Sequence, residues 1–84
     1  MHANKIRPFV RRALLVQMRE GVIEYMPGFS VTRVRNPDRR GAGFEIKIEG
    51  HMEEDSGHGV DVERLKSELM NRFPSTDFCV LKPF

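Results

Sequence analysis

The sequence predicts an α+β fold, a two-layer sandwich in which two helices cover one face of a three-stranded mixed sheet. Two segments have apolar residues at helical spacing, two neighbouring segments alternate as strands around a turn, and a short strand-like run ends the chain. The element order is therefore α-β-β-α-β. A chain of 84 residues is long enough for one core and too short for two, so we expect a single domain over residues 1–84.

Residues 6–20 have the spacing of an amphipathic helix. The apolar positions of this stripe are Ile6, Phe9, Val10, Ala13, Leu14 and Met18. Pro8 is then expected in the first turn, where its missing N–H costs little, and Gly21 is expected to end the helix in a left-handed conformation. Basic side chains, Arg11 and Arg12 among them, occupy the remaining surface. Residues 22–26 could form a short strand or could pack the end of the helix against the core. We expect Tyr25 to lie at the edge of the core.

The clearest strand is residues 44–49, whose alternation turns Phe44, Ile46 and Ile48 toward the core. Its hairpin partner, residues 29–35, alternates imperfectly. If Phe29 and Val31 face inward, Arg33 would do so too. We therefore expect a bulge near Thr32 or a change of face at Val34, with the basic end of the hairpin projecting beyond the packed body.

Residues 50–59 form a polar, glycine-containing segment that we expect to be a flexible loop. It contains His51 and His58 among acidic side chains, a composition that could bind a divalent metal. Because the ligands would come from one flexible loop at no recognised spacing, an acidic solvated loop is the favoured interpretation. No metal site is predicted, and the role of the two histidines stays open.

The second helix has a clear beginning and end. Asp61 is a suitable N-cap, Val60 and Leu65 are placed as a hydrophobic staple, and the helical stripe stops before Pro74. The helical apolar positions are Val62, Leu65, Leu69 and Phe73. Residues 77–81 then predict a final strand, in which Cys79 is expected to be a small buried hydrophobe.

The two helices and the crossover from the second strand to the third should all lie on one face of the sheet. This order resembles a split βαβ arrangement without its first strand, and also type II K-homology domains, although no helix-GxxG-helix element can be placed. The resemblance concerns topology and implies no function. The opposite sheet face would present Glu45, Lys47 and Glu49, which is not an aromatic platform for stacked bases.

Charge is distributed unevenly along the chain. Residues 1–47 contain ten Lys or Arg and four Asp or Glu, whereas residues 48–84 contain four and eight, giving +6 and −4 within a net charge of +2. The basic side chains that we predict to contact a partner are Arg33, Arg35, Arg39, Arg40, Lys47, Arg11 and Arg12. Such a polarised molecule suits a phosphate-binding face, and it suits a charged protein interface equally well.

From this charge distribution the sequence predicts a binding protein that is not an enzyme, with two alternative partners. The first is binding of DNA or RNA through the basic tip of the hairpin. The alternative is a protein-binding adaptor, inhibitor or assembly subunit that uses charged surfaces or sheet-edge pairing, with homodimer formation among the options.

The sequence does not predict an enzyme or a cofactor, because no Ser or Cys stands in a recognisable arrangement with a base and an orienting acid. One cysteine excludes an internal disulfide and favours a cytoplasmic location. The longest strict apolar run, Ala13 to Val16, is far too short to span a membrane, so no membrane association is expected.

Overall fold

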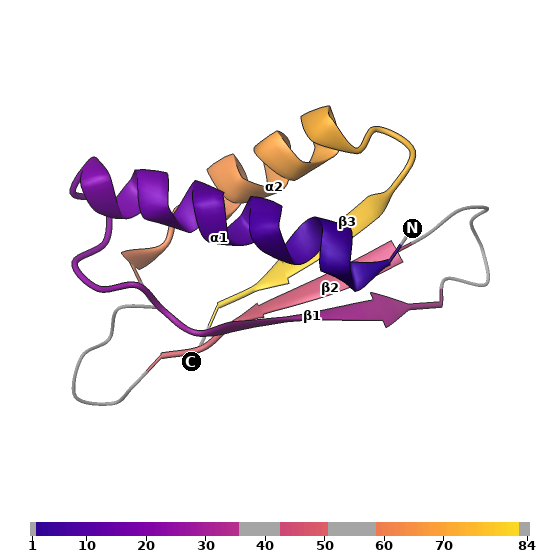
Figure 1. The fold of residues 1–84 in the computed structure, drawn as a ribbon, viewed down its shortest axis with the longest axis horizontal. Coiled ribbons are helices and arrows are strands. Elements are labelled where there is room, and N and C mark those ends of the chain that lie inside the picture. The colour runs from indigo at the N-terminus through magenta and orange to yellow at the C-terminus, as the bar shows by residue number, and fades with distance from the viewer. Residues whose placement is uncertain (1, 36–42, 51–58, 83–84) are drawn as a thin grey trace.

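A computed structural model of the chain describes residues 2–35, 43–50 and 59–82 (Figure 1). It confirms the predicted order, with α1 (Ala3–Arg19), β1 (Phe29–Val34), β2 (Gly43–Ile48), α2 (Val62–Arg72) and β3 (Asp77–Leu81). The strands pair in the order β1-β2-β3, β1 antiparallel and β3 parallel to the central β2. The mixed three-stranded sheet is therefore as predicted.

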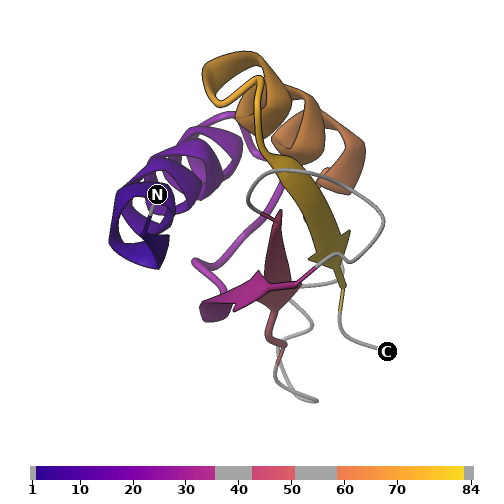
Figure 2. The same cartoon turned by 90° about the vertical axis from the view of Figure 1, so that its right-hand side faces the viewer.

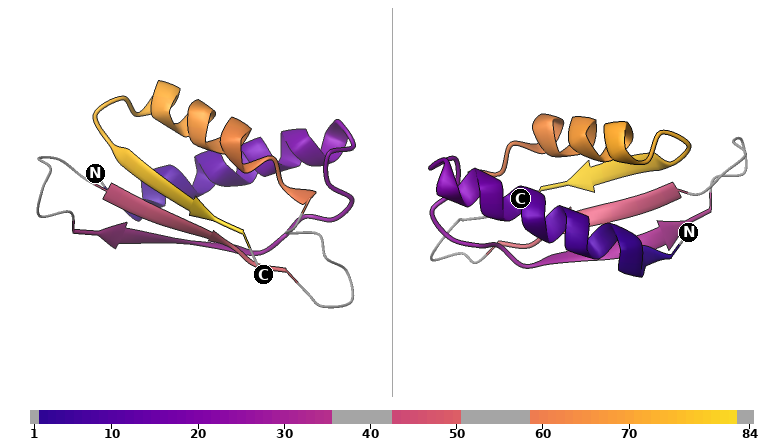
Figure 3. Two further views of the ribbon diagram at one scale, coloured as in Figure 1. Left: turned by 180° about the vertical axis from the view of Figure 1, so that it is seen from behind. Right: turned by 45° about the horizontal axis from the view of Figure 1, so that its top comes forward.

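Both helices lie on one face of the sheet, and none of the described elements covers the other face (Figures 1 and 3). Viewed along the strands, α1 lies over the β1 side and α2 over the β3 side (Figure 2). The core fills the space between the two layers. Its fully or almost fully buried apolar residues are Ile6, Val10, Ala13, Leu14, Ile23, Val31, Phe44, Ile46, Ile48, Val60, Leu65, Leu69 and Phe78.

Helix α1 begins three residues before the predicted position. Pro8 consequently lies inside the helix rather than in its first turn, and it cannot donate the helical hydrogen bond to the carbonyl of Asn4. Asn4 is exposed, so water can solvate that carbonyl. The other end is as predicted, because Gly21 follows the helix with a left-handed φ of 79°.

The hairpin register differs from the predicted irregularity. Strand pairing is continuous from Phe29↔Ile48 to Val34↔Gly43, so these strands contain no bulge and Val34 does not change face. Arg33 pairs with Phe44 and lies on the helix-covered face of the sheet. It is nevertheless exposed, because it stands near the end of an edge strand, beyond the last buried residue of β1, Val31.

Helix α2 follows its predicted signals. The Asp61 side chain accepts a hydrogen bond from the Arg64 N–H at 3.1 Å, which caps the helix. Val60 and Leu65 are both buried in the core, as the hydrophobic staple requires. The helix ends at Arg72, two residues before Pro74.

The structure resolves the ambiguity at residues 22–26, and it shows that the expectations for Tyr25 and Cys79 are wrong. Residues 22–26 form no strand, and Ile23 is the buried residue among them. Tyr25 is 51% exposed and does not seal the core edge. Cys79 is exposed, because the β3 register turns Phe78 toward the core and Cys79 to the open face beside Glu45.

Candidate functional site

The described members of the predicted basic site lie on different elements of the fold, with Arg11 and Arg12 on α1. Arg33 and Arg35 are exposed at the end of β1, on the hairpin as predicted. Lys47 lies on the open sheet face, where its Nζ is 3.7 Å from Glu45 Oε1, so its charge is partly balanced. Arg39 and Arg40 lie outside the described residues, as do His51 and His58.

The larger concentration of positive charge is on α1. This helix carries five basic residues and no Asp or Glu: Lys5, Arg7, Arg11, Arg12 and Arg19. All five are exposed, and none forms an ion pair within the described part of the chain. Helix α1 therefore presents unneutralised positive charge along its whole length.

Helix α2 is a useful contrast, because it carries three basic and two acidic residues in its sequence Val62–Arg72. Its Arg64 forms a two-pronged ion pair with Glu20, at 2.8 and 2.9 Å, and approaches Glu68 Oε1 at 3.4 Å. Arg64 of α2 thus takes part in the internal structure. The cations of α1 form no ion pair among the described residues, so they are available to contact a partner.

The beginning of α1 is itself electropositive. Its first turn contains no acidic residue, and the N-cap residue His2 makes no side-chain hydrogen bond to the helix. Lys5, in the first turn, therefore adds to the positive end of the helix dipole, an arrangement that costs about 0.3–1 kcal/mol at an exposed position. An anion bound at this end would remove that cost.

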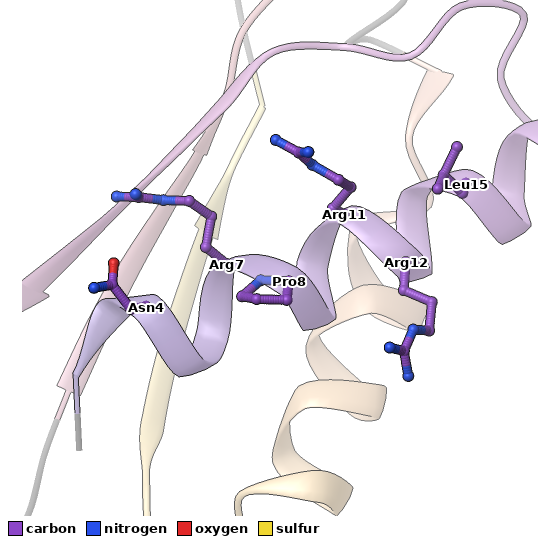
Figure 4. A pocket seen from close by; sticks show the side chains of 6 residues that line it. All are labelled: Asn4, Arg7, Pro8, Arg11, Arg12 and Leu15. Carbon is purple, nitrogen blue, oxygen red and sulfur yellow. The ribbon is translucent and has the colours of Figure 1, made fainter.

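A groove of about 490 Å³ runs along α1 (Figure 4). Its lining residues are Asn4, Arg7, Pro8, Arg11, Arg12 and Leu15. In Figure 4 the side chains of Arg7, Arg11 and Leu15 point toward the side on which the chain enters β1, whereas Arg12 points the other way, toward α2. Arg11 and Arg12, both predicted to contact a partner, therefore point to different sides of the helix.

A second groove of about 370 Å³ adjoins the first and shares Arg7, Arg11 and Leu15 with it. Its other wall is the segment that leads into β1, with Met26, Pro27, Gly28 and Phe29. We call the two together the α1–β1 groove. It has a cationic wall on α1 and an apolar wall on the entry to β1.

Sequence reasoning missed the most informative member of this site. In the sequence, Arg7 is only one of several basic residues on the helix surface. Its position four residues before Arg11 nevertheless indicates that the two side chains lie on the same face. Met26 and Phe29 carried no such signal, because their place beside α1 depends on how the chain returns after Gly21.

The end of β1 lies at the same end of the molecule as the start of α1, so Arg33 and Arg35 extend the basic surface there (Figures 1 and 3).

Neither a metal site nor a membrane span has support in the described residues. Over residues 2–35, 43–50 and 59–82, no three His, Cys, Asp or Glu side chains are grouped so that they could hold a metal ion. None of the helices described is both long and apolar enough to cross a membrane.

Comparison with known proteins adds no assignment, because no protein-family model, curated protein or solved structure matches this chain.

Proposed function

We propose that this protein binds nucleic acid through the basic surface formed by α1 and the end of β1. The observation that supports it is the charge of α1, which has five exposed cations, no acidic residue and no ion pair among the described residues. Phosphate contacts made by Lys and Arg supply most of the affinity of non-specific nucleic-acid binding.

The geometry of α1 suits a phosphate backbone. Arg7 and Arg11 are four residues apart, which places their Cα atoms about 6 Å apart along the helix axis. Both side chains point to the same side in Figure 4, so they can contact one strand together. Guanidinium groups can also donate two parallel hydrogen bonds to a phosphate, which Lys cannot do.

The predicted hairpin site remains part of this proposal. Arg33 and Arg35 lie where β1 ends, and Arg39 and Arg40 follow in the connection to β2. The net charge of only +2 limits the long-range attraction, so we expect moderate affinity that falls steeply with salt.

The test is binding of a fluorescein-labelled 12-nucleotide strand, measured by anisotropy over a salt series. Arg7 and Arg11 are changed together to Ala, and Arg33 and Arg35 in a second variant. Each pair should weaken binding and flatten the slope of log K against log salt by about one to two. A matched control changes Arg72 and Lys82, which are two exposed cations on the α2–β3 side. If all three pairs shift the slope equally, the surface is not the binding site.

A second candidate function, association with a protein, is favoured by a different observation. Strand β3 is an edge of the sheet, and a groove of about 350 Å³ beside it is lined in part by Val34, Met70 and Cys79. Met70 is 48% exposed on α2. An edge strand with no described strand along its outer side, and with apolar side chains next to it, suits strand addition or homodimer formation. Light scattering decides the homodimer: a dimer mass that Met70→Lys converts to a monomer supports it, and a monomer mass at all concentrations counts against it.

A further inference from the structure

We infer that the nucleic acid bound in the α1–β1 groove is single-stranded, and that one of its bases packs against the apolar wall at Met26 and Phe29. This inference rests on the proposed function and adds the form of the nucleic acid. The groove has two different walls, one cationic and one apolar, and binding of phosphate alone would require only the first.

The cationic wall and the apolar wall face the same space. Arg7 and Arg11 line it from α1, and Met26, Pro27 and Phe29 line it from the entry to β1. Met26 and Phe29 are half-buried, so part of each side chain remains open to the groove. Leu15, also half-buried, adds apolar surface on the α1 side. A ligand that fits this groove therefore has an anionic part and a flat or apolar part.

Single-stranded nucleic acid has both parts. Its phosphates match the guanidinium groups, and its unstacked bases can pack on aromatic and apolar side chains. In a duplex the bases are stacked inside the helix, so the apolar wall would have no partner. A volume of about 370 Å³ lies within the range of small-ligand sites and can admit a base, whereas a duplex is too wide to enter.

An acidic peptide would also complement the charge, but the cations favour a longer polyanion. The five cations of α1 are spread along a helix of 17 residues, which is about 25 Å long. Only Arg7 and Arg11 line the α1–β1 groove, and a nucleic-acid strand, which carries one charge per nucleotide, can extend beyond them to cations on the other side of the helix. The apolar wall occurs on one side of it only, where one base can leave the stack.

The test compares oligodeoxythymidine of 12 nucleotides with a duplex of the same length, at equal salt, on wild-type protein and two variants. We expect the single strand to bind at least tenfold more tightly. Phe29→Leu keeps an apolar side chain in the fold and removes the ring face, so it should weaken single-strand binding about tenfold without changing the salt slope. Phe29→Tyr keeps the ring and should bind like the wild type.

Each other outcome has a distinct meaning. Equal binding of the two forms, or a Phe29→Leu variant that binds like the wild type, overturns the inference and leaves the proposed function standing. Failure to bind either oligonucleotide at low salt overturns the proposed function itself. A poly-glutamate peptide included at equal charge concentration should bind more weakly than the single strand. If it binds more tightly, the groove is a site for acidic peptides.

Discussion

Gln17 joins two parts of the chain that are far apart in sequence. It is fully buried in α1, and its side-chain Nε2 donates to the Asp61 carbonyl at 3.1 Å. Its Oε1 accepts from the Asp61 N–H at 2.9 Å. One amide thus satisfies both backbone groups of the residue that caps α2, and it fixes the end of α1 to the start of α2.

The change Gln17→Met tests this role, because it keeps the approximate volume and removes both hydrogen bonds. The Asp61 N–H then loses its acceptor in a partly buried position, so the free energy of unfolding should fall by about 1–3 kcal/mol. Urea unfolding followed by circular dichroism measures it. The control Asn71→Met, which replaces an exposed amide on α2, should change the free energy of unfolding by no more than about 0.5 kcal/mol. Equal effects at the two positions would show that the Gln17 bonds contribute little.

Single residues were predictable where their chemistry is local. The Asp61 cap and the left-handed Gly21 follow from backbone groups within a few residues, and both are confirmed. Gln17 lies on the buried stripe of α1, but its partner Asp61 is 44 residues away, so sequence alone does not identify the hydrogen bonds between them. The exposure of Cys79 likewise depends on the register of β3 against β2, which sequence alone does not fix.

At the scale of elements, the strands and α2 were predicted to within a residue or two at either end, while the start of α1 was not. Apolar alternation and helix caps are strong local signals in β2 and α2. Pro8 favours a first-turn position, although a proline can also lie one turn further in when the residue whose carbonyl loses its donor is exposed, as Asn4 is. The error moved Lys5 into the helix and added a cation to its first turn.

The contact between the ends of α1 and α2 predicts a pH dependence. Hydrogen bonds from Arg64, together with its charge, hold the pKa of the Glu20 carboxyl below its usual value. A carboxyl whose pKa is lowered by folding contributes stability above its unfolded pKa of about 4.3, and that contribution is lost as the pH falls through the lower folded-state pKa. Glu20→Gln should therefore destabilise the protein at pH 7 and have almost no effect near pH 2.

This difference is measured as the free energy of unfolding of Glu20→Gln against wild type across the acid range. Because the pair is exposed, added salt should reduce the effect at pH 7. Glu24→Gln is the control, since Glu24 is an exposed carboxylate with no ion pair within the described residues. A Glu20→Gln effect that persists unchanged at pH 2 would mean that packing, not charge, links these helix ends.

At the scale of the whole molecule, the sequence shows the uneven distribution of charge along the chain. It does not show where the fold places the basic side chains. The positive half of the chain comprises α1, β1 and most of β2, and the structure puts the unpaired cations among its described residues on α1 and at the end of β1. The prediction concentrated on the hairpin because Arg33, Arg35, Arg39 and Arg40 are close in sequence. The α1–β1 groove needed the fold, since its two walls lie on either side of the turn at Gly21.

A chain of phenylalanine rings connects almost all the elements. Phe73, at the end of α2, meets Phe9 of α1 edge to face at 5.7 Å and Phe78 of β3 at 6.1 Å. Phe78 in turn stacks with Phe44 of β2 at 6.3 Å. Only β1 lies outside this chain of described rings. Phe73 is therefore the point at which the two helices and the sheet meet, although it is only half-buried.

Phe73→Ala should consequently destabilise the molecule as one unit. We expect the free energy of unfolding to fall by about 2 kcal/mol or more, out of a total of roughly 4–13 kcal/mol for a domain of this size, with Tm lower by roughly 10 °C. Tyr25→Ala, at an exposed aromatic residue, should change Tm little and is the matched control. Thermal unfolding followed by far-ultraviolet circular dichroism and by Tyr25 fluorescence should give coincident transitions in Phe73→Ala, because the rings hold both layers in one cooperative core. Two separate transitions would contradict this, and would show that α2 and β3 unfold independently of α1.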